Sequence, residues 1–365
     1  MIFSNPAWVD KLGTTLRRGP NVIDETLRLR ASHRQAFPFL QPDTYVDSAN
    51  HSLLAIDGTP TIPLSGRGNT LTILCNESGT TIGYRSDSLG FRNPSDIWDP
   101  IHPDVALIGD SFAHGFCRPE TETIAARLRA AGIHVANGGL TGAGPLAELG
   151  IVREFMSIAK PRHVYWLFYE GNDLIDITSE RKTQLISYLK PDYSQHLVEH
   201  RHDIDRAIEA FSNTLLAMHR APTRAQQIWN FLLLRKLRTA TGLYRQPSSR
   251  GGDEVEESAI LESVLRQAAS EVKAWGGQLT LVYLPERRRF NKRSRAVVGE
   301  NHDPGVVQQR VRGIARRLGI PIVDVAEIFA SREHPTKLWN ARRYHYNAEG
   351  YGVVAQAIAA DLVKH

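Results

Sequence analysis

Residues 105–111 read VALIGDS, a short apolar run that ends in a glycine, an acid and a serine. A run of this length that is bounded by a turn predicts a buried strand. Two further runs, HVANGG and HVYWLFYEGND, follow it, and the helical patterns ETIAARLRAAG and AELGIVREFMSIA separate the three. Because strands that alternate with helices form parallel sheets with right-handed crossovers, this part of the chain predicts an α/β fold.

The same alternation resumes near the C-terminus. Helical patterns cover residues 255–275 and 304–318, the runs QLTLVYLP and IPIVDV predict strands, and EGYGVVAQAIAADLVK predicts a last helix. Upstream, residues 53–92 alternate apolar and polar positions between Gly, Asn, Ser and Pro, which predicts a small antiparallel unit. Residues 179–244 show only helical spacing, and residues 245–254 have the composition of a surface linker.

These patterns divide the chain into four parts. We expect an N-terminal segment at 1–52, a small β-rich unit at 53–100, an α/β domain made of 101–178 and 255–365, and a helical insertion with its linker at 179–254. With 365 residues, the chain is long enough to bury a core of this size.

Composition and spacing exclude several classes of protein. Lys and Arg number 44 against 39 Asp and Glu, and so small and scattered a surplus does not indicate a nucleic-acid binder. Cys75 and Cys117 lie outside any zinc-binding spacing and allow at most one disulfide bond, and we expect Cys117 to be a small buried apolar residue. The glycines of GGLTGAG lack the spacing of a nucleotide-binding loop. We therefore expect no cofactor, and the sequence indicates no particular oligomeric state.

The sequence predicts neither a membrane span nor a signal peptide. No apolar run approaches the length of a membrane helix, and MIFSNPAWVDKLGTTLRRG lacks the three regions of a secretory leader. These features predict a cytoplasmic protein, or a periplasmic one if a native N-terminal anchor was removed. The stretch IWNFLLLRKLR has a basic face, which is typical of a helix packed on the domain and less often of one that contacts a membrane surface.

Polar residues follow three successive predicted strands. Ser111 comes directly after the first strand, NGGLTG at 137–142 ends the second, and EGND at 170–173 ends the third. The carboxyl ends of parallel strands meet at one edge of the sheet, where open α/β folds bind ligands. A carboxamide and an unhindered glycine N–H suit the stabilisation of a tetrahedral oxyanion. His345 precedes the last helix, where an imidazole can serve as general base for Ser111.

The blocks GDSFAHG, NGGLTG, EGND and HYNAEGY, in this order, resemble the four blocks of the SGNH (GDSL-type) hydrolases. The match covers residues 103–175 and 320–365. The segments PLSGRGNTLTILCNESG, SDSLGFRNP and YEGNDL also resemble a bacterial subgroup that is associated with cell-surface polysaccharides. The resemblance implies a three-layer, flavodoxin-like α/β fold with a central parallel sheet, to which the small β-rich unit and a helical insertion over the active edge are added.

By this resemblance, Ser111 is the nucleophile and His345 the general base, and the oxyanion hole combines the amides of Ser111 and Gly142 with the Asn172 side chain. The implied activity is that of a serine esterase or deacylase that removes, or transfers, a small acyl group such as an O-acetyl on a carbohydrate. Its partner would be a small-molecule or glycan ester. We expect further substrate contacts from Asp110, His114, Gly139 and Tyr344. Tyr169, Tyr344 and Tyr346 would stack on sugar rings unless these aromatic residues belong to the core.

One position departs from the family pattern. The family usually has an aspartate three residues before the histidine, where this chain has Arg342, and Arg343 fills the alternative position. Neither side chain can accept a proton from imidazole. Asp324, Glu349 or a backbone carbonyl would then orient His345. The alternative interpretation is a catalytically weakened SGNH fold that binds glycans or assists their assembly.

Two other motifs carry alternatives of their own. Residues 196–200, HLVEH, match an inverted zinc-peptidase pattern for which Glu271 is a candidate third ligand, although such polar helices are usually solvated. Residues 286–293, ERRRFNKR, follow a predicted strand and form either a solvated loop or a rim that attracts an anionic glycan.

Overall fold

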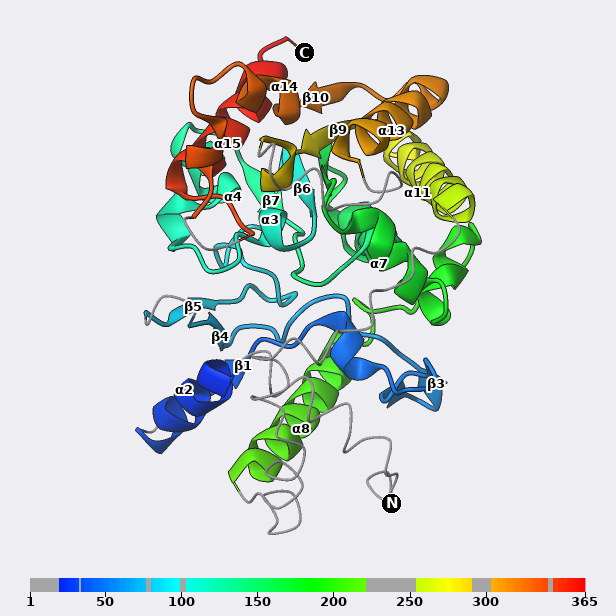
Figure 1. The fold of residues 1–365 in the computed structure, drawn as a ribbon. Coiled ribbons are helices and arrows are strands. Elements are labelled where there is room, and N and C mark those ends of the chain that lie inside the picture. The colour runs from blue at the N-terminus through cyan, green and yellow to red at the C-terminus, as the bar shows by residue number, and fades with distance from the viewer. Residues whose placement is uncertain are drawn as a thin grey trace, which may run out of the picture.

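A five-stranded parallel sheet forms the centre of the molecule (Figure 1). The computed structural model describes residues 20–32, 34–76, 80–98, 103–220, 254–290, 303–340 and 344–364. The spatial order is β7-β6-β8-β9-β10, which is the flavodoxin-like order 2-1-3-4-5 when these strands are numbered along the chain. The predicted fold class is therefore confirmed. The strands are β6 (Val105–Gly109), β7 (Val135–Asn137), β8 (His163–Tyr169), β9 (Gln278–Leu284) and β10 (Ile322–Asp324).

Helices cover both faces of this sheet (Figure 1). The central strand β8 is buried on both sides, since Trp166 and Phe168 join one apolar cluster while Tyr165 and Leu167 join the other. One face is covered by α4 (Ile124–Ala130), α14 (Val325–Ala330) and α15 (Ala348–Leu362). The other is covered by α5 (Pro145–Ile151), its π-helical continuation (Val152–Met156), α6 (Ser157–Ala159), α7 (Asp173–Glu180), α11 (Glu254–Ala274) and α13 (Pro304–Leu318).

Short elements connect the layers. The four-residue helix α3 (Ser111–His114) follows β6 directly. Single 3-10 turns occupy Glu120–Glu122, Gln184–Leu189, Arg287–Phe290 and Pro335–Leu338.

A smaller unit at the N-terminus lies below the carboxyl edge of the main sheet (Figure 1). The antiparallel pairing predicted after residue 53 is present in the hairpin β2–β3 and in β4–β5. A further strand, β1, joins β4 in parallel, which its three-residue AFP sequence gave no reason to expect. The elements are α2 (Pro20–Ala31), β1 (Ala36–Pro38), a 3-10 turn (Pro42–Tyr45), β2 (Ala55–Ile56), β3 (Thr59–Pro60), β4 (Leu71–Cys75) and β5 (Ile82–Arg85).

Helix α8 (Arg201–Arg220) packs against this N-terminal unit (Figure 1). Arg201 donates hydrogen bonds to the carbonyl oxygens of Gly66 and Leu89, each at 3.0 Å. Asp205 accepts the backbone N–H of Gly68 at 2.9 Å. Helix α8, which falls within the predicted helical insertion, therefore supports the small unit.

The segment SDSLGFRNP fastens the small unit to the main sheet. Asn93 accepts the N–H of Asn137 at 2.8 Å and donates to the carbonyl of the same residue at 3.1 Å, so that it pairs with β7 along its free edge. The buried carboxylate of Asp87 holds Asn93 in place at 2.8 Å. Because an unpaired edge strand is a site of unwanted association, this pairing also protects the sheet.

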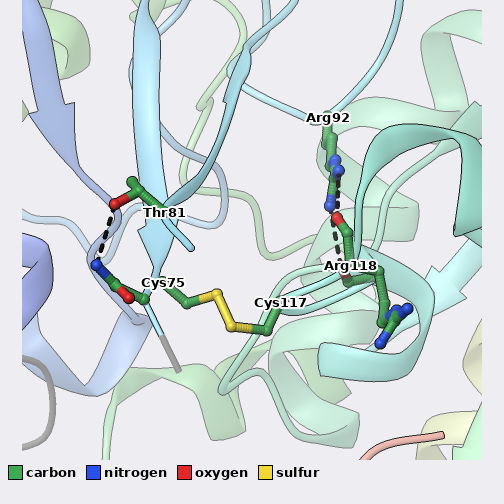
Figure 2. The surroundings of a disulfide bond; sticks show 7 residues. Cys75, Thr81, Arg92, Cys117 and Arg118 are labelled. Atoms are coloured by element: carbon green, nitrogen blue, oxygen red, sulfur yellow. Dashed lines mark hydrogen bonds between the residues drawn. A yellow bond between two sulfur atoms is a disulfide. The ribbon is translucent and has the colours of Figure 1, made fainter. Parts of the chain in front are cut away.

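A disulfide bond makes a second link between the two parts (Figure 2). It joins Cys75 at the end of β4 to Cys117, three residues after α3. The expectation that Cys117 is a free apolar residue is therefore wrong, because the fold brings two cysteines 42 positions apart to a Cα–Cα distance of 5.6 Å. Beside the bridge, the buried Arg92 donates to the carbonyl oxygens of Gly115 and Arg118, each at 2.9 Å (Figure 2).

The stretch IWNFLLLRKLR lies outside the described residues, as does nearly all of the predicted linker at 245–254. Within the part of the chain that the structure describes, no helix combines the length and apolar character needed to cross a bilayer.

We expect the double variant Cys75→Ala, Cys117→Ala to lose about 2–4 kcal/mol of unfolding free energy, because the bridge restricts a loop of 42 positions in the unfolded chain. Urea denaturation under non-reducing conditions measures the loss. As a control, a reductant should destabilise the wild type to the same degree and leave the double variant unchanged. Equal stability of the two proteins without reductant would contradict the prediction.

Candidate active site

Ser111 stands at the carboxyl end of β6, at the point where the strand order of the sheet reverses. Asp110 caps the short helix that begins at Ser111, since its carboxylate accepts the N–H of Phe112 at 2.9 Å. The apolar side chain of Phe112 is buried in the core and anchors the turn. This arrangement presents the Ser111 hydroxyl at the sheet edge, where open α/β folds bind ligands.

His345 reaches Ser111 from a loop that precedes α15. Its ring lies 5.1 Å from that of Phe112 and 5.2 Å from that of Phe116, centroid to centroid. The next residue, Tyr346, is fully buried and donates to the carbonyl of Pro285 at 2.7 Å, which fixes the loop. The distance between His345 Nε2 and Ser111 Oγ is 2.8 Å. The predicted general base and the predicted nucleophile, 234 positions apart in sequence, are thus in hydrogen-bond contact.

Asn172 and Gly142 face the same cavity as Ser111. Asn172 occupies the position before α7, and its side-chain amide donates to Asp176 at 2.8 Å and more weakly to Asp110 at 3.3 Å. Gly142 has a φ of +83°, a conformation that favours glycine, and a Cβ on it would lie 2.9 Å from the Gln41 side chain. The structure therefore brings the four residues of the predicted catalytic set together.

Helix α7 holds the turn that carries Gly142. The carboxylate of Glu180 accepts the N–H of Gly144 at 2.7 Å and that of Leu146 at 2.9 Å. A Cβ on Gly144 would approach that of Asp176 to 2.6 Å, so the turn and the helix are in close contact. One face of α7 thus positions both the Asn172 amide and the glycine turn.

The other predicted contact residues are more scattered. Asp110 lines the cavity, and its carboxylate lies 3.3 Å from Ser111 Oγ. His114 is buried behind it, with Nδ1 2.8 Å from the Thr141 hydroxyl and Nε2 3.1 Å from that of Tyr84. Burial lowers the pKa of His114 to about 3, so the ring is neutral.

Gly139 and Tyr344 do not line the cavity. Gly139 lies against the backbone of α3, where a Cβ would overlap the His114 N–H. Tyr344 is 84% exposed to solvent. Tyr169 and Tyr346 are both buried and belong to the core rather than to a sugar-stacking surface.

The N-terminal unit supplies one wall of the cavity, which sequence reasoning missed. Gln41, Asp43 and Asn50 line a space of about 370 Å³ together with the strand-end residues of the main domain. Thr183 and Leu185, which follow α7, complete the opposite side. Leu185 lies in a stretch with helical spacing, and no motif includes any of these residues. Neither feature places them at the site, so only the docking of the two units reveals them.

Several carboxyl groups around the cavity titrate abnormally. Burial raises the pKa of Glu180 to about 7 despite its hydrogen bonds from backbone N–H groups. Burial also raises the pKa of Asp110, and it raises the pKa of Asp176 strongly, with added repulsion from Glu180 and Asp110. These groups hold protons to a higher pH than ordinary carboxyl groups.

Asp324 and Glu349 are the two carboxylates predicted as possible partners of His345. One oxygen of Asp324 accepts from Gln308 and Arg312, each at 2.8 Å, and the other caps α14. Glu349 is exposed in the first turn of α15. Arg342 and Arg343 lie outside the described residues.

The residues of the HLVEH motif and Glu271 are not gathered into the predicted metal site among the described residues. Within the described ranges, the group with metal-ligand spacing is Asp57, His200 and Asp203, which leaves out His196. Glu271, the candidate third ligand, pairs instead with Arg153.

The arginine-rich segment after β9 is partly neutralised. Arg289 forms an ion pair with the buried Glu170, and Arg288 pairs with Glu286 at 2.7 Å. Residues 291–293 lie outside the described part of the chain.

Comparison with known proteins yields structural matches only. No family model and no curated protein matches the chain. Among solved structures, it is similar to a GDSL-like lipase from Bacteroides thetaiotaomicron, with a TM-score of 0.39, 12% identity and coverage of 71% of this chain and 87% of the other. It is also similar to a lipase/acylhydrolase from Enterococcus faecalis (0.38, 12%, 71% and 94%) and to an acetyl xylan esterase (0.40, 12%, 70% and 98%).

The raised pKa of Glu180 predicts that stability falls as pH rises from 5 to 8. The folded state holds this proton up to a pH of about 7, against a usual value of 4.5, so the stabilisation is complete below pH 4.5 and is lost as pH rises through 7. In Glu180→Gln, the decrease in unfolding free energy should be smaller by on the order of 3 kcal/mol.

Urea denaturation at pH 5, 6.5 and 8 measures this slope. The exposed control Glu333→Gln should retain the wild-type slope, because Glu333 is 89% exposed. An unchanged slope in Glu180→Gln would show that Glu180 titrates normally.

Proposed function

We propose that this chain is a serine esterase of the SGNH type that acts on a small acyl ester. The observation that carries the proposal is the 2.8 Å contact between His345 Nε2 and Ser111 Oγ inside the cavity. The motif order supports the same assignment, because GDSFAHG, NGGLTG, EGND and HYNAEGY contribute Ser111, Gly142, Asn172 and His345 in that order.

The geometry supports a two-step acyl transfer. Ser111 Oγ attacks the acyl carbon while its proton passes to His345 Nε2, and the tetrahedral intermediate collapses as the alcohol leaves with that proton. Water then gives a proton to His345 and attacks the acyl-enzyme, and Ser111 recovers the proton when the acid leaves. A hydroxyl of a second glycan in place of water would make the reaction a transfer.

The oxyanion that forms in each step needs donors already in place. We assign this role to the backbone N–H groups of Ser111 and Gly142 and to the side-chain amide of Asn172. The 2.8 Å bond to Asp176 orients the Asn172 amide, while the longer contact with Asp110, at 3.3 Å, is the weaker of the two and can be exchanged for the oxyanion.

For the substrate, we propose an O-acyl group, such as an acetyl, on a carbohydrate. The cavity of about 370 Å³ suits a small acyl group and part of a sugar. Polar side chains around it can bind hydroxyl groups: Gln41, Asn50, Thr141, Ser179 and Thr183. The resemblance of SDSLGFRNP and YEGNDL to a subgroup associated with cell-surface polysaccharides points the same way.

We also infer that the protein acts in an oxidising compartment, as in the periplasmic alternative considered above. The bond between Cys75 and Cys117 supports this inference, because such bonds rarely persist in a reducing cytosol.

Ser111→Ala should abolish hydrolysis of p-nitrophenyl acetate, with a loss on the order of a thousandfold or more in kcat, because the hydroxyl forms the covalent bond. His345→Ala should be nearly as damaging, and the double variant scarcely worse than either. A fluorophosphonate should label the wild type at Ser111, as detected by mass spectrometry. Neither turnover nor labelling in the wild type would favour the glycan-binding alternative.

Asn172→Ala should lower kcat by roughly a hundredfold to a thousandfold with little change in KM, because its amide acts mainly on charge that develops in the transition state. Steady-state kinetics with p-nitrophenyl acetate separates the two constants. A change confined to KM would instead make Asn172 a substrate-binding residue.

A further inference from the structure

The charged side chains that line the cavity are almost all acidic. Asp43, Asp110, Asp176 and Glu180 contribute carboxyl groups from three separate segments. Among the described residues of the lining there is no lysine or arginine, and His345 is the one basic side chain. The protein as a whole carries a formal charge of +5, whereas the four acids of the described lining carry formal negative charge.

Two further carboxyl groups lie close to the acids of the lining. Asp173 and Glu148 are fully buried, and burial together with repulsion from the neighbouring carboxylates raises the pKa of both well above the usual value. Asp43 differs from the others because it is exposed at the cavity and lies on the N-terminal unit. A positive group in the cavity would relieve the repulsion, whereas a negative one would increase it.

We propose that the site selects esters whose alcohol carries a positive charge, such as an amino sugar, and rejects those with an anionic alcohol. The inference deepens the proposed function and rests on it. The positive charge belongs to the alcohol because the proposed acyl group is small, so the larger alcohol is the part that extends to Asp43. Asp43 is then a specificity-determining residue that does not take part in bond making or breaking.

Three acetate esters of similar size test the proposal: acetylcholine, its uncharged isostere 3,3-dimethylbutyl acetate, and the anionic 2-acetoxyethanesulfonate. We expect kcat/KM to fall in that order, with at least a tenfold advantage of the cation over the isostere. Raising the ionic strength from about 0.05 to about 0.5 M should lower the ratio of kcat/KM for the cationic ester to that for the isostere, because salt screens the exposed Asp43. Asp43→Asn should reduce the ratio several-fold.

Asp57→Asn provides the matched control. Asp57 is an exposed acid on the same N-terminal unit but lies outside the cavity lining, so the ratio should not change. A cation preference that is equally strong in Asp43→Asn would overturn the assignment of Asp43. Equal, Ser111-dependent turnover of all three esters would overturn the charge selection and leave the esterase assignment intact.

Binding to Ser111→Ala decides the question independently of turnover. Calorimetry should give a lower Kd for choline than for 3,3-dimethylbutanol, by about the ratio found in kcat/KM. If the wild type hydrolyses none of the esters, the esterase assignment fails. The proposed charge selection is then tested by the calorimetric Kd values alone. Equal affinity for the two alcohols, or binding of neither, would then overturn it.

Discussion

The parallel pairing of β6 with strands on both sides is the constraint on which the site depends. Its register sets Gly109 opposite Leu167 of β8, and backbone bonds from Gly138 to Leu107 and from Leu140 to Gly109 continue the pairing with β7 past the strand end. At the end of β6 the chain is therefore still flanked by β8 on one side and by the segment after β7 on the other. For this reason the turns that carry Ser111, Gly142 and Asn172 meet at one edge of the sheet.

The sheet edge alone would be open to solvent. The N-terminal unit covers one side of it and so forms a cavity. Three chemically different links hold the unit: the pairing of Asn93 with β7, the bonds from Arg92 to the turn after α3, and the disulfide. Two of them end within seven residues of Ser111, at Gly115 and Cys117. The wall that carries Gln41 and Asp43 is therefore fixed relative to the nucleophile rather than merely packed near it.

Strand periodicity and the strand-end rule could predict the sheet, the helices around it and the positions of Ser111, Gly142 and Asn172, and the fold class is confirmed. They could not predict the cavity wall, because Gln41 lies in a segment without periodicity and the disulfide joins cysteines in no known spacing. His114 shows a different limit. Its place on the first helical turn suggests a site residue, but contacts with Thr141 and with Tyr84 and Phe39 of the N-terminal unit enclose the ring in the core.

The acids around the site differ in what they do for the fold. Asp176 and Glu180 each hold a part of the proposed oxyanion hole, so a change in either alters the geometry of Asn172 or of the glycine turn together with the local charge. Within the described residues, the Asp43 side chain forms no hydrogen bond with Asn172 or with the glycine turn, and it belongs to the N-terminal unit. A substitution of an acid on α7 would therefore change both the site geometry and the cavity charge. A substitution of Asp43 would change the charge alone. If the proposed function holds, substitutions in that wall change substrate preference while the proposed oxyanion donors stay in place.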